Sequence, residues 1–227
     1  MKLRTFAGGF VLGVAAAIAA GAAFSAQEAG KTKSPPDKPA VHMPTQEEMA
    51  AGMKAWMDAA TPGEEHKKMA KAVGSYDTVT RIWMAGPDAP PSETKGTSEI
   101  KSVLDGRFLL QTEKGQFPMP DMQTGEVKMT PMEGIGLFGY DNYQKMYVGC
   151  WADSLGTQLL NMRGTLSPDG KTSTMYGEMD EPMLGVRGRM VKYVTQHLEG
   201  GNHVFTIYDL AVGDDYKVVE VTYTRKK

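Results

Sequence analysis

Histidine is the residue type here that most readily binds a metal or moves a proton, and the chain has four, at positions 42, 66, 197 and 203. His197 and His203 flank Gly200-Gly201, a pair typical of a tight turn between strands. A two-residue turn would place the two histidines on opposite faces of a sheet, whereas an odd-numbered turn would bring them to one face. We therefore expect rim histidines, with a metal or haem site as the weaker alternative. His42 falls in a proline-rich segment and His66 in an exposed-looking helix, so neither is assigned a role.

Methionine is the second residue type with metal chemistry, and the chain has 17. Four of them cluster in and beside the segment 117–131: Met119, Met122, Met129 and Met132. Such thioethers suit Cu(I), but methionine also fills irregular cores, and the other methionines show no metal-like repeat. We expect no metal and no cofactor, and copper in this segment is the weaker alternative.

No catalytic pattern stands out in the sequence. It contains no Gly-x-Ser-x-Gly, no His-Glu-x-x-His and no phosphate-binding loop. Asp153, Glu178 and Asp180 fall near expected strand ends, where acidic residues are usually solvated. Cys150 is the single cysteine, which excludes an internal disulfide. We assign no catalytic residue, and an enzyme of unknown chemistry remains an alternative.

Aromatic and arginine side chains on expected strands are the candidates for a binding site. The aromatic candidates are Trp83, Phe108, Tyr140, Trp151 and Tyr208. Five arginines could be interior cations for a carboxylate-bearing ligand, because a buried arginine needs a partner: Arg81, Arg107, Arg163, Arg187 and Arg189. Of these we place Arg107 and Arg163 in the predicted site.

The N-terminal residues have the layout of a secretory signal. Lys2 and Arg4 precede an uncharged run, residues 5–26, rich in Ala and Gly, with small residues before a cleavage point near Ser25 and Ala26. Cleavage predicts a periplasmic or secreted protein with no stable membrane span, and an uncleaved membrane anchor is the alternative. The mature chain would keep 23 basic and 27 acidic residues, a net charge of −4, which excludes nucleic acid as a partner.

Residues 27–44 hold three lysines and four prolines and predict a disordered tether. Thr45-Gln46-Glu47-Glu48 has the spacing of a helix capping box, and an apolar stripe follows at Met49, Met53, Trp56 and Met57. A second short helix is expected to begin at Thr61-Pro62-Gly63-Glu64 and to end before Gly74. We expect these helices, residues 45–73, to pack on the domain that follows.

Residues 74–227 read as a succession of strands separated by turn-forming residues. Ten strands are predicted, at residues 76–84, 94–104, 107–117, 132–140, 145–154, 158–166, 172–179, 189–198, 203–209 and 216–225. Turn signals such as Asp105-Gly106 and Asp141-Asn142 join them as antiparallel hairpins. The fold class predicted is mostly β, a ten-stranded antiparallel up-and-down barrel preceded by two short helices.

Several glycine-containing segments stand out together: Gly96-Thr97-Ser98-Glu99, Gly106-Arg107-Phe108-Leu109, Gly134-Ile135-Gly136, Gly139-Tyr140-Asp141-Asn142 and Tyr147-Val148-Gly149, with Trp151. Taken together, they resemble a bacterial family called domain of unknown function 1579. The resemblance runs from about Met43 to the C-terminus and implies a lipocalin-like or nitrobindin-like barrel and no agreed activity. A longer insert, residues 117–131, departs from the family pattern. The lack of glycine in residues 76–83 departs from the glycine-rich run of haem-binding relatives and speaks against haem.

The leading hypothesis is an exported barrel that binds a small apolar or amphipathic molecule in its interior. The alternatives are a structural or interaction barrel whose interior is filled by its own side chains, and an enzyme. Cavity volume separates the first two, since a pocket of roughly 300 Å³ or more favours binding. A buried carboxylate or histidine with a displaced pKa would favour the enzyme.

Overall fold

The computed structural model describes residues 43–227 apart from residues 85, 87, 122, 125 and 183. The predicted signal peptide, most of the predicted tether, His42 and Met122 lie outside the described residues. Residues Thr45–Lys227 form one compact unit.

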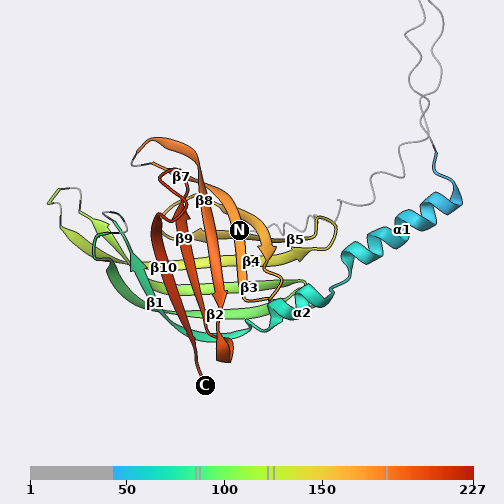
Figure 1. Ribbon diagram of the computed structural model, residues 1–227, viewed down its shortest axis with the longest axis horizontal. Coiled ribbons are helices and arrows are strands. Elements are labelled where there is room, and N and C mark those ends of the chain that lie inside the picture. Colours follow the sequence, from blue (N-terminus) through green and yellow to red (C-terminus); the bar gives the residue numbers. More distant parts are fainter. Residues whose placement is uncertain (1–42, 85, 87, 122, 125, 183) are drawn as a thin grey trace, which may run out of the picture. The chain divides into compact units, whose positions relative to one another are not determined.

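Two helices and ten strands make up this unit (Figure 1). In chain order they are α1 (Gln46–Ala60), α2 (Glu64–Ala70), β1 (Gly74–Ile82), β2 (Ser92–Val103), β3 (Phe108–Pro120), β4 (Val127–Asp141), β5 (Met146–Asp153), β6 (Leu160–Leu166), β7 (Thr172–Glu181), β8 (Val186–His197), β9 (His203–Asp209) and β10 (Lys217–Arg225), with a short 3₁₀ turn at Glu199–Gly201. Each strand pairs antiparallel with its neighbours in sequence, and β1 pairs with β10 to close the barrel. The predicted fold class is confirmed.

Strong twist makes β8–β10 cross steeply over β2–β4 in Figure 1. Because strand side chains alternate, every second residue faces the interior, as Leu109, Gln111 and Glu113 do in β3. The barrel has two ends. We call the end that carries α2 and the β2–β3, β4–β5, β6–β7 and β8–β9 connections the α2 end, and the opposite end the β7–β8 end.

The helices differ in how they contact the barrel. Helix α2 covers part of the α2 end, where Met69 packs against a core formed by Tyr76, Ile100, Leu109, Val221 and Tyr223. We expected His66 on an exposed surface, but it is buried: its Nδ1 accepts a hydrogen bond from the backbone N–H of Gly63, and its ring meets that of Tyr140 edge-on. Helix α1 has the predicted capping box at Thr45 but buries none of its residues, so its apolar stripe is exposed.

The segment 117–131, expected to be an insert between strands, extends the β3–β4 hairpin instead. Phe117 pairs with Thr130, and the pairing continues to Pro120 and Val127. Strand β2 pairs with β3 only as far as Lys114, so the prolines lie where β3 has a single neighbour and a missing N–H costs little. The hairpin therefore projects beyond the barrel wall (Figure 1).

Candidate functional site

The interior of the barrel holds a cavity of about 1520 Å³. Its lining reaches from the α2 end, at Met69 and Leu166, to the β7–β8 end, at Trp83 and Leu184. The walls are mainly apolar, with thioether and aromatic groups such as Met162, Met175, Met179, Phe138, Trp151 and Phe205. An apolar wall of this size suits a ligand with a large hydrophobic body.

Three glycines create room for two of the rings that line the cavity. A Cβ at Gly134 would lie 2.1 Å from Trp151 Cζ2, and one at Gly149 would lie 2.5 Å from Phe138 Cδ1. Gly136 lies next to both rings. A Cβ at this position would be 2.4 Å from Phe138 Cε2 and 3.0 Å from Trp151 Cε3. The rings therefore lie flat against bare backbone, which widens the cavity on the β4–β5 wall.

A polar cluster crosses the interior between β2, β3 and β10. Glu113 is 5% exposed, and its Oε2 accepts hydrogen bonds from Tyr223 Oη at 2.9 Å and from Gln111 Nε2 at 3.3 Å. Gln111 Nε2 also lies 3.1 Å from Ser98 Oγ. Burial raises the pKa of the Glu113 carboxyl, and the two donated hydrogen bonds oppose this rise in part.

His203 stacks on the same tyrosine. The His203 and Tyr223 rings are 4.2 Å apart and nearly parallel, and Tyr76 meets His203 edge-on at 5.1 Å. Burial lowers the pKa of His203 to about 4. A hydrogen bond to the backbone of Gly201 raises this pKa, but its effect is smaller than that of burial. The histidine is therefore neutral at physiological pH.

The connection between the two C-terminal histidines is the odd-numbered alternative and not a two-residue turn. Five residues, 198–202, separate β8 from β9, and Gly200 and Gly201 both adopt positive φ (70° and 79°) within a 3₁₀ turn. His197 therefore pairs directly with His203, and both face the cavity. Within the described part of the chain, no group of three or more His, Cys, Asp or Glu side chains is placed to hold a metal ion.

An ion pair occupies the β7–β8 end of the cavity. Arg189 Nε donates to Asp209 Oδ1 at 2.8 Å, and Nη2 lies 2.5 Å from Oδ2, so the contact is bidentate. The two side chains are 14% and 12% exposed. The Asp209 carboxylate raises the pKa of Arg189, which keeps the guanidinium charged.

Two buried hydroxyls lack hydrogen-bond partners: Thr78 Oγ1 and Tyr193 Oη. Thr78 pairs with Tyr223 across the β1–β10 ladder, beside the Glu113 cluster. Tyr193 is 2% exposed, lines the cavity and stacks with Phe205. Burial raises the pKa of Tyr193 to about 12, so its hydroxyl stays protonated and able to donate.

The structure brings two of the predicted site residues, Trp83 and Trp151, to the cavity lining. The others are not among the lining residues: Phe108, Tyr140, Tyr208, Arg107 and Arg163. Tyr140 packs with His66 and Tyr147 under α2, Tyr208 lies under the Lys192 ammonium, and Arg163 is exposed. The Arg107 guanidinium contacts the Leu104 carbonyl, and the Phe108 ring covers Gly139.

Of the five arginines considered as interior cations, Arg189 is the one that lines the cavity. Glu113, Gln111 and Tyr223 were not predicted from the sequence. The sequence feature that could have indicated two of them is the alternation on one strand face, where the polar Gln111 and Glu113 follow the apolar Leu109.

The fold and the site define a class: a closed antiparallel β-barrel with a large, mainly apolar interior cavity. The chain belongs to the family described as Protein of unknown function (DUF1579), whose model matches residues 61–225. No curated protein matches the sequence. Among solved structures, the chain is similar to the S-type phycobiliprotein lyase CPES from Guillardia theta, with 13% identity, a TM-score of 0.40, and coverage of 76% of this chain and 97% of that one. Among the described residues, no helix is long and apolar enough to cross a membrane.

Proposed function

We propose that this protein is exported and binds a small apolar or amphipathic molecule inside its barrel. The cavity carries the proposal: about 1520 Å³ is more than the roughly 300–1,000 Å³ of common ligand pockets. A barrel filled by its own side chains would leave no such space, so the volume favours binding over the structural alternative. Export rests on residues 1–26, and its test is subcellular fractionation with the intact mass of the mature chain.

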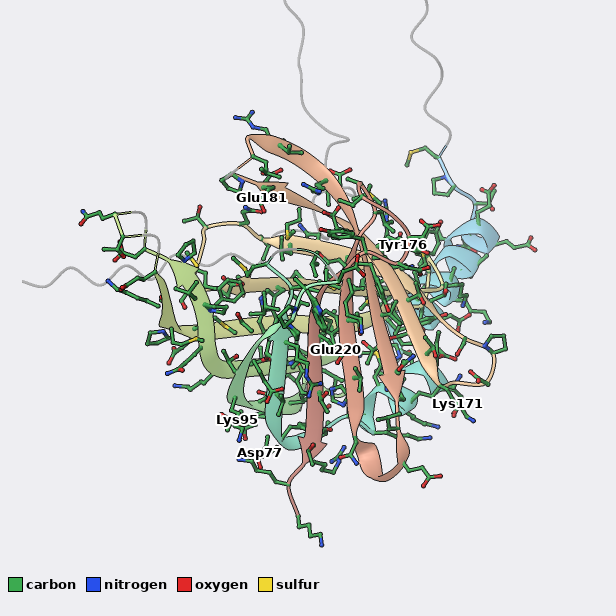
Figure 2. All side chains as sticks on the ribbon, turned by 60° about the vertical axis from the view of Figure 1, so that its left-hand side comes forward. Asp77, Lys95, Lys171, Tyr176, Glu181 and Glu220 are labelled. Atoms are coloured by element: carbon green, nitrogen blue, oxygen red, sulfur yellow. The ribbon has the colours of Figure 1, made fainter. Side chains whose placement is uncertain are left out.

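Titration with the fluorescent apolar probe N-phenyl-1-naphthylamine tests binding in the cavity. Met175 and Tyr176 are neighbours on β7, but Met175 lines the cavity and Tyr176 is 44% exposed on the outer wall (Figure 2). Met175→Trp should fill space and weaken probe binding by about tenfold or more, while the matched Tyr176→Trp should leave it unchanged. Absence of probe binding to the folded wild-type protein, or equal effects of the two variants, would contradict an interior site.

Native mass spectrometry of the protein purified without added ligand addresses the identity of a natural ligand. A co-purifying molecule in the wild type that is missing from Met175→Trp would place it in the cavity. An absorption spectrum of the same sample detects haem or copper, the weaker alternatives.

Catalysis is a second candidate, because Glu113 and His203 are both buried at the cavity with displaced pKa values. Tyr223 contacts both groups, through a hydrogen bond to Glu113 and a stacked face to His203. If the protein is an enzyme, Glu113→Gln should retain a co-purified molecule that the wild type converts.

A further inference from the structure

Glu113 is a buried carboxylate without a cationic partner among the described residues. Both of its donors, Tyr223 and Gln111, are neutral, and both reach Oε2, while Oε1 receives no hydrogen bond from the described residues. An unpaired carboxylate in an apolar interior is costly, and such groups are usually paired or functional. The Glu113 side chain lines the cavity from β3, one residue before the β2–β3 pairing ends at Lys114.

The charges at the two ends of the cavity are unequal. At the β7–β8 end the lining includes one positively charged group, the guanidinium of Arg189. The negatively charged groups there are the carboxylates of Asp153, Asp180, Glu181 and Asp209. Asp209 already neutralises that guanidinium. At the α2 end the lining includes three basic residues, Lys68, Lys71 and Arg225, and one acidic residue, Asp169. Figure 2 shows Glu181 at one end of β7 and Lys171 just before the other. An approaching cation is therefore attracted to the β7–β8 end.

The wall holds further polar capacity that the protein itself does not use. Tyr193 Oη is fully buried, lines the cavity and has no hydrogen-bond partner. Its oxygen can accept a hydrogen bond from a ligand, and its proton can be donated to one. A buried hydroxyl left unpaired costs free energy, so a ligand that pairs it gains affinity.

We propose that the cavity binds amphipathic amines, with the protonated amine at Glu113 and the apolar body along the Met162 and Met175 wall. This rests on the proposed function, since it assigns a ligand class to the same cavity. An ammonium group supplies the missing cation and can donate to Glu113 Oε1. A ligand carboxylate would instead be repelled by Glu113 and by the acidic lining of the β7–β8 end.

The test compares three probes that share one alkyl chain: decylamine, decanol and decanoic acid. Their dissociation constants are measured at pH 7.5, below micelle formation, by calorimetry and by displacement of N-phenyl-1-naphthylamine. The wild type should bind decylamine about tenfold or more tightly than decanol, and decanoic acid most weakly. Glu113→Gln keeps the shape and polarity of the side chain, and it should abolish the preference for the amine while leaving decanol binding intact.

Glu133→Gln is the matched control, because Glu133 is exposed on the outer wall of β4, where it pairs with Lys114 at 2.8 Å. It removes one carboxylate without touching the cavity and should keep the amine preference. Equal binding of all three probes, or preference for the acid, overturns the amine assignment and leaves the cavity as a binding site. Failure of all three probes and of the naphthylamine contradicts the proposed function itself. The wild-type series decides the assignment even if Glu113→Gln does not fold.

Discussion

Replacing His203 by phenylalanine should reverse the order of stability between the variant and the wild type as the pH falls. Phenylalanine keeps a planar ring on Tyr223, 4.2 Å away in the wild type, and removes the titrating nitrogens. It also removes the hydrogen bond between the His203 ring and the Gly201 backbone, a loss of about 1 kcal/mol. At pH 8 the variant should therefore be less stable by about that amount.

The pH dependence follows from the lowered pKa of His203. In the unfolded chain the imidazole titrates near about 6.5, whereas in the fold its pKa is about 4. The stability contributed by neutral His203 is therefore complete above the unfolded pKa and is lost as the pH falls toward 4. Proton linkage gives a loss of roughly 1.4 kcal/mol at pH 5.5 and roughly 2.5 kcal/mol at pH 4.5. The two proteins should be equally stable near pH 6, and the variant should be more stable by about 1.5 kcal/mol at pH 4.5.

Urea unfolding at pH 8, 6 and 4.5 measures both proteins, and taking their difference cancels titrations that they share, including that of Glu113. His197→Phe is the control, because His197 faces His203 across the strand pair but is exposed, so its change with pH should be smaller. A stability difference between His203→Phe and wild type that is constant with pH would refute the buried neutral histidine.

Three further predictions concern stability. Asp209→Ala leaves the Arg189 guanidinium unpaired at 14% exposure and should cost about 3 kcal/mol in urea unfolding, whereas Arg189→Met with Asp209→Leu should recover most of that loss; equal loss in both would contradict the pairing. Gly164→Ala places a Cβ 1.9 Å from the Thr174 carbonyl oxygen and should cost about 2 kcal/mol or more, while Gly213→Ala, with no atom within 4 Å, should change stability by less than about 0.5 kcal/mol. Thr45→Ala removes the N-cap of α1, so the helical circular dichroism signal should fall. The thermal midpoint of unfolding should stay constant, because α1 buries none of its residues. A lowered midpoint would show that α1 packs on the barrel.

The strands were predictable because their signals are local. Turn-forming residues separate segments that are rich in β-branched and aromatic residues. Closing the resulting row of antiparallel strands into a barrel removes the exposed sheet edges. Residues 118–131 were not predicted as strand, because the segment 117–131 departs from the family pattern and we expected an insert between the third and fourth strands. Prolines are tolerated there because β3 has one neighbour beyond Lys114, a fact of register that the sequence does not display.

The polar cluster was not predictable because both faces of β3 look alike in sequence. Leu109, Gln111 and Glu113 face the cavity, and Leu110, Thr112 and Lys114 face outward, so each face carries one leucine and two polar residues. Hydrophobic alternation cannot choose between such faces. The choice is made across the barrel, where Tyr223, 110 residues away, donates to Glu113.

The glycines that carried the family resemblance acquire a physical role in the structure. Gly134, Gly136 and Gly149 leave the space in which the Trp151 and Phe138 rings lie, so a side chain at any of them would push a ring into the cavity. Trp151 is fixed further by its indole N–H, which donates to Asp153 at 3.0 Å. A protein that needed only a stable barrel could fill this interior with larger side chains. Glycines that hold the rings flat against the wall preserve volume instead, and preserved volume next to a buried, unpaired carboxylate is what a binding site for an amphipathic amine requires.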